Sequence, residues 1–368
     1  MKKYIAYKFR LYPNKNQQEL IIKTFGCCRF IWNKMLDDKI KYYEETNQIL
    51  LNNPSQYKEE FSFLKEVDCR ALVNVQNDLN SSYKRFYNKQ NNFPHFKSKK
   101  KDKKCYTTNN INKYNDIVVI DKTHIKLPKL GLVKFKLSRN IPNNHYIKKA
   151  TISCSNTNKF YISLLLEYEW NKPNINLDKN KSIGLDYSSP NFYIDSEGNS
   201  PDDYIRIFRK YENKLSREQK KLSHCKYESN NYYKQKLKVS KIYEKIQNSR
   251  LDFLHKLSTY LSNEYDIICV EDINMKNISQ GLKLGKSTMD NSYGRFRDLL
   301  SYKLELKGKK LIKIDKWFPS SKKCSCCGNI YKELKLQDRI YICPSCNSIL
   351  DRDKNAAINI LNGGLKLI

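Results

Sequence analysis

The sequence predicts a multidomain α/β protein, and three observations indicate this fold class. Residues 105–170 consist of short segments in which apolar and polar residues alternate, separated by Asn, Gly, Pro or Asp, as in a small β-domain. Residues 182–274 combine two apolar strands, each ending in an acidic residue, with a long helical stretch between them. Residues 324–346 contain two Cys-x-x-Cys pairs, which are typical of a small metal-binding unit.

The first half of the chain is expected to form a small β-barrel with an inserted helical lobe. Residues 1–11 contain a strand in which apolar and basic side chains alternate. Residues 12–104 space their apolar side chains as helices do, at about 16–48 and again at about 67–88. If the first strand joins the strands of residues 105–178, the helices between them become an insertion in the barrel.

The second half is expected to form a mixed α/β domain that a metal-binding unit interrupts. Residues 179–318 make up the first part of this domain, residues 319–349 the metal-binding unit, and residues 350–368 the closing part. The elements predicted from the spacing of apolar residues are strands near 182–186, 192–195, 265–271 and 311–317, two helices hinged near 223–231 within 203–263, and helices near 290–309 and 353–363.

The two Cys-x-x-Cys pairs predict a structural zinc site. Cys324 and Cys327 form the first pair, and Cys343 and Cys346 form the second. Four thiolates complete a tetrahedral zinc site and leave no open position for water, so the ion would be structural rather than catalytic. A redox-active pair is the alternative interpretation. Cys326 also lies in the first knuckle and is a rival ligand.

The composition points to a polyanionic partner. Lys and Arg number 69 against 38 Asp and Glu, which gives a formal net charge of +31. A nucleic acid is the usual partner of such a charge, and the 27 Tyr and 15 Phe offer rings that can stack on bases. No apolar run is long enough to span a bilayer, so no membrane association is expected. Scattered cysteines without further paired spacing suit a reducing cytoplasm.

Three acidic residues follow apolar strands or precede a helix, and together they indicate a nuclease. Asp186 and Glu271 end predicted strands. Asp353 directly precedes Lys-Asn-Ala-Ala, where the last helix is expected to begin, so we expect it both to cap this helix and to face the metals. A single acid of this kind is more often a helix cap, but two divalent cations that cleave a phosphodiester need several carboxylates. An RNase H-like sheet would bring these three together around two magnesium ions. Asp351 is the rival for the third position.

A series of segments from the start of the chain to its end carries a resemblance to a known family. These segments are AYKFRLYPNKNQ, FGCCRFIWN, DCRALVNVQNDL, FPHFKSKK, IKLPKLG, IGLDYSSPNFYIDSEG, RLDFLHKLS, VEDINM, DKWFPSSKKCSCCG and LDRDKNAAINIL. Through them the chain resembles the TnpB family, the transposon-encoded RNA-guided DNA endonucleases that are related to compact type V CRISPR effectors. The resemblance implies a wedge-type barrel with a helical recognition lobe, followed by a RuvC nuclease domain with a zinc-ribbon-like unit inserted. It also implies that Asp186, Glu271 and Asp353 are the RuvC acids.

The resemblance also implies the partners. A guide RNA made from the transposon end would pair with one strand of double-stranded target DNA, while the protein reads a short flanking motif. Asn74 and Gln76 carry amides that can read base edges, with ordinary helix-surface polarity as the alternative. Tyr106, Thr107 and Asn109 are further candidates for nucleic-acid contacts. No small-molecule substrate is expected.

Two other functions remain open from the sequence. A guided DNA-binding protein that has lost cleavage would need no acid trio, whereas this chain keeps all three acids. The second alternative is an unguided RuvC-like nuclease or transposase. The long basic first half of this chain is more than such an activity needs. RNA that copurifies with the protein would separate guided from unguided action.

Overall fold

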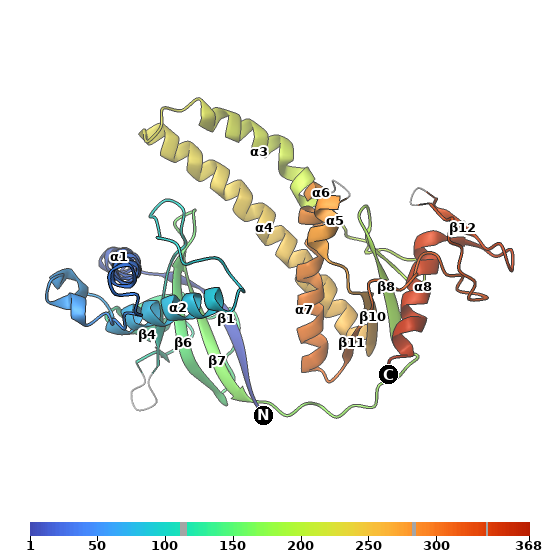
Figure 1. Cartoon of the computed structure of the whole chain (residues 1–368), viewed down its shortest axis with the longest axis horizontal. Helices are drawn as coiled ribbons and strands as arrows, with labels where there is room; N and C mark the ends of the chain where they lie inside the picture. The colour runs from blue at the N-terminus through green and yellow to red at the C-terminus, as the bar shows by residue number, and fades with distance from the viewer. Residues whose placement is uncertain (111–115, 282–284, 336–337) are drawn as a thin grey trace. The chain divides into compact units, whose positions relative to one another are not determined.

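The chain divides into two compact units, Met1–Asn171 and Lys172–Ile368, called unit 1 and unit 2 below (Figure 1). The computed structural model describes residues 1–110, 116–281, 285–335 and 338–368. The domain boundary predicted between residues 178 and 179 lies a few residues beyond this division. None of the helices described is long and apolar enough to cross a membrane.

Unit 1 is built on one antiparallel sheet of seven strands. The strands are β1 (Lys2–Tyr12), β2 (Lys104–Asn109), β3 (Val118–Val119), β4 (His124–Leu127), β5 (Gly131–Lys136), β6 (His145–Cys154) and β7 (Phe160–Glu169). Their order is β2-β6-β7-β1-β5-β4-β3. Because β1 pairs with β7 and β5, the prediction that the first strand joins the later ones is confirmed. The pairing of the described residues is open from β2 to β3, so closure into a barrel stays a prediction.

Two long helices supply the rest of the unit 1 core. Helices α1 (Lys15–Thr46) and α2 (Cys69–Tyr87) confirm the two predicted helical stretches and share one hydrophobic cluster with the sheet. Asn14 begins α1 with a capping box, because its Oδ1 accepts from Gln17 N and Gln17 Oε1 accepts from Asn14 N (2.9 and 3.0 Å). Gln17 Nε2 also donates to the carbonyls of Leu130 and Leu132, which ties the helix to the β5 hairpin.

Unit 2 contains a four-stranded sheet in the order β11-β10-β8-β9. The strands are β8 (Ser182–Ser188), β9 (Phe192–Asp195), β10 (Ile267–Glu271) and β11 (Lys310–Ile314). Strand β10 runs parallel to both β8 and β11, and β9 is antiparallel to β8. The predicted strand at 311–317 is shorter than expected, because the carboxylate of Asp315 accepts from Trp317 N and turns the chain.

Helices cover both faces of this sheet (Figure 1). The helices of unit 2 are α3 (Ile207–Ser223), α4 (Asn230–Glu264), α5 (Met275–Gly281), α6 (Gly285–Asn291), α7 (Tyr293–Leu306) and α8 (Arg352–Leu365), of which α4, α7 and α8 pack on the sheet. Side chains of α4 and α7 form one core with Ile183 and Leu185 of β8. Helix α8 lies on the opposite face, where a side chain at Gly184 would collide with the backbone of Ala357. Glycine at this position therefore lets α8 approach the central strand closely.

Helices α3 and α4 form a long hairpin whose turn confirms the predicted hinge. Helix α3 ends at Ser223, and Ser229 caps α4 by accepting from Tyr232 N (3.1 Å). The buried carboxylate of Asp290 anchors the base of the hairpin, since it accepts from Phe208 N and pairs with Arg250 at 3.0 Å. The predicted helix near 290–309 begins later, at residue 293, after Ser292 in the left-handed region.

Residues 319–349, called the cysteine unit below, precede α8. Their regular structure is the short strand β12 (Ile340–Ile342), which pairs with β13 (Ile349–Asp351). A small core of Cys324, Tyr341 and Cys343 holds the unit together. So small a core cannot fold a segment by itself, which is the usual reason for a structural metal.

Candidate functional site: an acid cluster beside a four-cysteine centre

Two of the predicted acids lie side by side on the parallel strands of unit 2. Leu185 of β8 is paired with Val270 of β10, so the next residue on each strand, Asp186 and Glu271, reaches the same edge of the sheet. Asp186 follows Gly184 by two residues and therefore shares the face that α8 covers. The first turn of α8 brings Asp353 to this face. These three residues are called the acid site below.

Asp186 lies close enough to Glu271 and Asp353 for their charges to affect its pKa. Burial raises the pKa of Asp186 well above its usual value, and the carboxylates of Glu271 and Asp353 raise it further. Burial also raises the pKa of Glu271. Buried carboxylates that repel one another are relieved by a divalent cation, which prefers such oxygen ligands. The residues present therefore fit magnesium.

Neighbouring side chains hold two of these acids in place. Ser320 donates a hydrogen bond to Glu271 Oε1. The guanidinium of Arg352 donates to Asp353 Oδ1 at 3.0 and 3.2 Å, and that of Arg339 approaches Asp353 Oδ2 at 3.4 Å. Within the described ranges, the four cysteines are the one group of at least three metal-ligand side chains whose ligand atoms all lie within 4.8 Å of one another. The three carboxylates of the acid site are therefore near enough for their charges to act on Asp186, but their oxygens do not all lie within 4.8 Å of one another.

The backbone at the start of α8 separates Asp351 from Asp353. Asp351, and not Asp353 as expected, caps the helix: its Oδ1 accepts from Lys354 N at 2.9 Å. Asp353 lies inside the first turn, with only 18% of its side chain exposed. The expectation that Asp353 caps α8 is wrong, because the helix begins at Arg352, two residues before the start that a cap at Asp353 would require. Asp353 therefore lies inside the helix, where its charge acts on Asp186.

The four predicted zinc ligands converge in the cysteine unit. Cys324 Sγ lies 3.7 Å from Cys346 Sγ, and Cys327 Sγ lies 3.5 Å from Cys343 Sγ. Tetrahedral zinc bound to four sulfurs at about 2.3 Å requires similar separations, so the residues present fit zinc. Cys326 is exposed and is not part of this group.

Two buried asparagines of α8 connect the cysteine unit to the acid site. Asn355 Nδ2 donates to Lys323 O (2.7 Å), while its Oδ1 accepts from Ser325 N (2.9 Å). Asn359 Nδ2 donates to Ser320 O (2.9 Å). Because Ser320 also binds Glu271, these bonds fix the knuckle, the helix and one acid relative to one another.

The sequence analysis singled out none of Ser320, Arg352, Asn355 and Asn359 as site residues. The available signal was position: Ser320 lies within the DKWFPSSKKCSCCG segment, and the other three lie within LDRDKNAAINIL. Arg297 was also missed, although its guanidinium donates to the carbonyls of Glu271 and Ile273 (3.0 and 2.9 Å) and fixes the end of β10.

The proposed base-reading residues of unit 1 are already engaged within the protein. Asn74 is buried, and its Nδ2 donates to Arg70 O, Thr107 O and Asn109 Oδ1. Gln76 Nε2 donates to Asn52 O at 2.9 Å. Both amide nitrogens therefore fasten α2 to its surroundings. Reading a base through them would require an exchange of hydrogen bonds.

Three of the five candidates nevertheless border a cavity of about 960 Å³ between α1, α2 and β2. Asn74, Tyr106 and Thr107 line it, whereas Gln76 and Asn109 do not. Tyr106 is buried against Phe25, with ring centroids 5.9 Å apart, and Thr107 shares a hydrogen bond with Thr151. The basic residues of the lining are Arg29, Lys97, Lys99, Lys101, Lys103 and Lys104.

Family models match three segments of the chain. Residues 1–48 match the model described as "Helix-turn-helix domain", residues 166–281 match "Probable transposase", and residues 293–360 match "Cas12f1-like, TNB domain". The first segment forms β1 and α1 here, rather than two helices. The last includes the cysteine unit and most of α8.

Several curated relatives match over nearly the whole chain. The "Putative RNA-guided DNA endonuclease" of Streptomyces pristinaespiralis is 30% identical over 98% of this chain and 89% of the relative. The "Putative RNA-guided DNA endonuclease InsQ" of Escherichia coli K12 is 30% identical over 99% of this chain and 93% of the relative. The "TnpB-like protein L770" of Acanthamoeba polyphaga mimivirus is 26% identical over 98% of this chain.

A solved structure has the same fold. A chain in the "Cryo-EM structure of the Cas12f1-sgRNA-target DNA complex" aligns with a TM-score of 0.61, over 98% of this chain and 99% of that one. The two chains are only 12% identical, so the likeness is one of architecture.

Proposed function

Because this chain belongs to the TnpB family, we propose that it is an RNA-guided DNA endonuclease of a transposable element that cleaves double-stranded DNA beside a short flanking motif. The observation that carries the proposal is the acid site, in which Asp186, Glu271 and Asp353 meet from two strands and a helix. Two of the relatives that match nearly the whole chain are named "Putative RNA-guided DNA endonuclease", which supports the same conclusion.

In this proposal, residues 179–318 and 350–368 form a RuvC-type, RNase H-like nuclease domain, and residues 319–349 are its zinc-binding insertion. The parallel strands β8, β10 and β11 with antiparallel β9 support the assignment. Residues 1–11 and 105–178 form the wedge domain, and residues 12–104 the recognition lobe. The single sheet of unit 1, with α1 and α2 inserted between β1 and β2, is consistent with that division.

Asp186, Glu271 and Asp353 would hold two magnesium ions, which supply Lewis-acid stabilisation of the attacking and leaving oxygens of the phosphodiester. Ser320 orients Glu271 through its hydrogen bond. Arg352 and Arg339 neutralise Asp353 in the structure and would have to yield at least part of that contact when Asp353 binds a cation. The cysteine unit, with zinc on its four thiolates, positions Ser320 and the start of α8.

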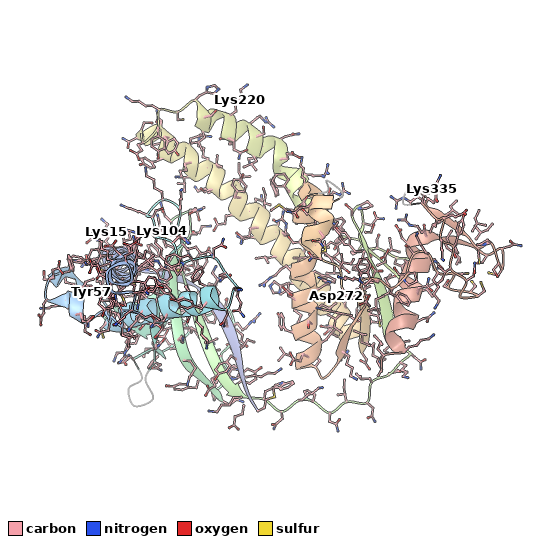
Figure 2. The ribbon with its side chains drawn as sticks, viewed as in Figure 1. Lys15, Tyr57, Lys104, Lys220, Asp272 and Lys335 are labelled. Carbon is pink, nitrogen blue, oxygen red and sulfur yellow. The ribbon has the colours of Figure 1, made fainter. Side chains whose placement is uncertain are left out.

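The partners proposed are a guide RNA derived from the transposon end and double-stranded target DNA. A net charge of +31 is suited to holding the phosphates of a guide and of the heteroduplex that it forms. Both units contribute lysines to this charge, among them Lys15, Lys104, Lys220 and Lys335 (Figure 2). The relatives' names, and the sgRNA and target DNA bound in the matching Cas12f1 complex, support this choice. A guide delegates sequence reading to base pairing, so the protein itself needs few base contacts.

We propose that the flanking motif is read in the cavity of unit 1 between α1, α2 and β2, and not by the five predicted residues acting separately. The lysines that line this cavity would contact phosphates. The space for bases is bordered by Asn74, Tyr106 and Thr107, and Asn74 would contact a base through its side-chain carbonyl oxygen. Gln76 and Asn109, which lie outside the lining, act by supporting α2 and β2. Replacing Asn74 by Ala should then change motif preference by about 1–3 kcal/mol, and Gln76→Ala should leave the preference unchanged.

The test is cleavage of a plasmid library with a randomised flank, performed with two guides of unrelated sequence. We expect the cut sites to move with the guide while one flanking motif persists, and divalent cations to be required. Cuts that ignore the guide would identify an unguided RuvC-like nuclease. Guided binding without any cutting, in wild-type protein supplied with magnesium, would identify a guided DNA-binding protein.

A further inference from the structure

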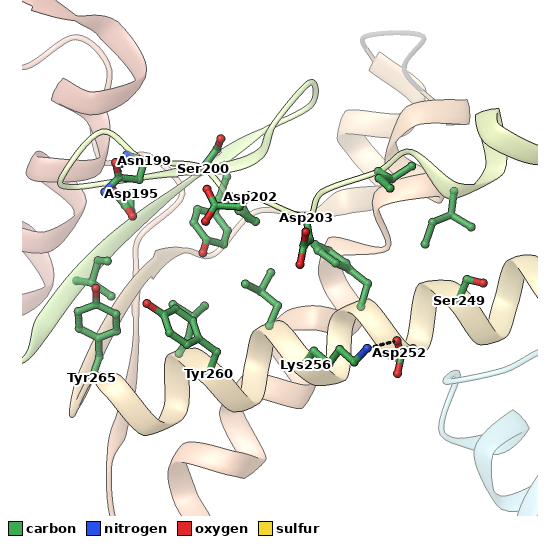
Figure 3. Close-up of a pocket in the computed structure, with 18 of the residues that line it drawn as sticks. Asp195, Asn199, Ser200, Asp202, Asp203, Ser249, Asp252, Lys256, Tyr260 and Tyr265 are labelled. Carbon is green, nitrogen blue, oxygen red and sulfur yellow. Dashed lines mark hydrogen bonds and ion pairs between the residues drawn. The ribbon is translucent and has the colours of Figure 1, made fainter.

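A cavity of about 740 Å³ in unit 2 lies apart from the acid site. Its walls come from β9 with the loop that follows it, and from α4 (Figure 3). Ile183 of β8 lines it, and Ile183 belongs to the core on the α4 face of the sheet. Asp186 lies on the α8 face. The sheet therefore separates the cavity from the three acids.

The cavity is acidic in a strongly basic chain. Of its acids, Glu197, Asp202 and Asp203 form no ion pair with a Lys or Arg in the part of the chain that is described. Asp252 pairs with Lys256 at 2.8 Å, so these two charges cancel. Asp195 uses Oδ1 to accept from the amides of the following loop. The remaining cation in the lining is Lys210, which leaves an excess of carboxylate charge.

A tyrosine hydroxyl without a protein partner also borders this cavity. Tyr193 is 4% exposed and lines the cavity, yet its hydroxyl has no hydrogen-bond partner among residues 1–110, 116–281, 285–335 and 338–368. Burial raises its pKa, and the next contributions come from Asp195, Tyr265 and Tyr260, which also line the cavity. Its ring packs against Phe192 and Phe296, so the hydroxyl at the border of the cavity is left for water or a ligand to satisfy.

The lining favours an organic cation over a bare metal ion. No acid-rich group in the described ranges brings its ligand atoms within 4.8 Å, as a coordinated metal would require. Aromatic rings stand opposite the carboxylates instead: Figure 3 shows Tyr260 and Tyr265 across the space from Asp195 and Asp202. Carboxylates with ring faces bind alkylammonium groups, and the volume is that of a small-molecule site.

We propose that this cavity binds a linear aliphatic polyamine, with its ammonium groups at Asp202, Asp203 and the Tyr193 hydroxyl and its methylene chain against the tyrosine rings. The occupant would join the loop after β9 to α4 and so stiffen unit 2. The proposal does not depend on the nuclease assignment, since the cavity and the acid site lie on opposite faces of the sheet.

The test is calorimetric titration of spermidine into the full-length protein, freed of nucleic acid, at about 0.3 M salt to screen exposed charges. We expect one site per chain. The double variant D202N/D203N should bind at least about ten-fold more weakly, since two charge-assisted bonds are lost. The matched control E59Q/E60Q removes two adjacent exposed acids of unit 1 and should bind like wild type.

Tyr193→Phe guards against a folding defect, because it removes only the hydroxyl and should weaken binding about five-fold. Equal affinity in wild type and D202N/D203N, or no binding in wild type, would overturn the proposal. If magnesium chloride at matched ionic strength displaces spermidine, the binding is only nonspecific attraction of cations to negative charge, and the proposal is overturned. Tighter binding of tetralysine than of spermidine would assign the cavity to a basic segment of a protein and overturn the polyamine.

Discussion

The cysteine unit and the acid site, both in unit 2, differ in how they are assembled. The thiols of the cysteine unit converge within 4.8 Å of one another, on two knuckles separated by a short stretch of chain. The acid site draws its residues from β8, β10 and α8, which lie far apart in the sequence, and two arginines hold one of them. Short turns bring the ligands of a local site together, whereas a dispersed site depends on the packing of distant elements and on its charge balance.

The largest effect should come from removing a carboxylate of the acid site. Asp186→Asn or Asp353→Asn should lower DNA cleavage by a factor on the order of 10³ or more, because a cation ligand is lost. Guided DNA binding, measured by filter retention in the same preparations, should stay near wild type. Asp351→Asn is the matched control: it weakens only the cap of α8 and should retain cleavage. Normal cutting by Asp353→Asn with loss in Asp351→Asn would reverse the assignment.

Removing a thiol of the cysteine unit should mainly reduce the zinc content and the stability of residues 319–349. Wild-type protein should contain about one zinc per chain, and Cys343→Ser should lose it and unfold residues 319–349. Cys326→Ser, one residue from a ligand, should keep its zinc, as measured by atomic emission. Zinc loss in the Cys326 variant would mean that the knuckle uses a different sulfur.

Asn355→Ala tests whether the two centres are coupled. The change leaves Lys323 O and Ser325 N without their partner, which should cost about 1–3 kcal/mol in the free energy of unfolding. We expect zinc to remain bound while cleavage falls, since the start of α8 is no longer fixed to the knuckle. Thermal unfolding, zinc content and cleavage rate are the three measurements. Unchanged cleavage in a destabilised variant would show that the centres act independently.

The smallest effect concerns pH and the metal-free protein. The raised pKa of Asp186 means that protonation favours folding, so its contribution to stability is present at acid pH and is lost as pH rises through the folded-state pKa. Without divalent cations, Asp186→Asn should therefore melt a few degrees above wild type at neutral pH, and the gap should narrow on acidification. Magnesium should stabilise wild type more than the variant. A variant that melts below wild type at every pH would contradict the raised pKa.

Much of this architecture follows from local sequence. Apolar spacing predicted α1, α2, the hinge between α3 and α4, and the strands that carry Asp186 and Glu271, because periodicity reflects which face is buried. The Cys-x-x-Cys spacing predicted the converged thiols, since each knuckle is a short turn that brings its own two ligands together. These features involve residues near one another in the chain.

Tertiary packing decided what the sequence could not. Which aspartate caps α8 depended on a two-residue shift in where the helix begins, and helix boundaries respond to the packing around them. The helical spacing of α2 predicted that the side-chain amides of Asn74 and Gln76 could contact bases. In the structure these amides donate instead to Thr107 and Asn52, which belong to other segments of the chain. The acidic cavity joins β9 to α4 and left no local pattern. The spacing of apolar residues along the chain indicates which face of a helix or strand is buried. It does not indicate which distant residues pack against that face.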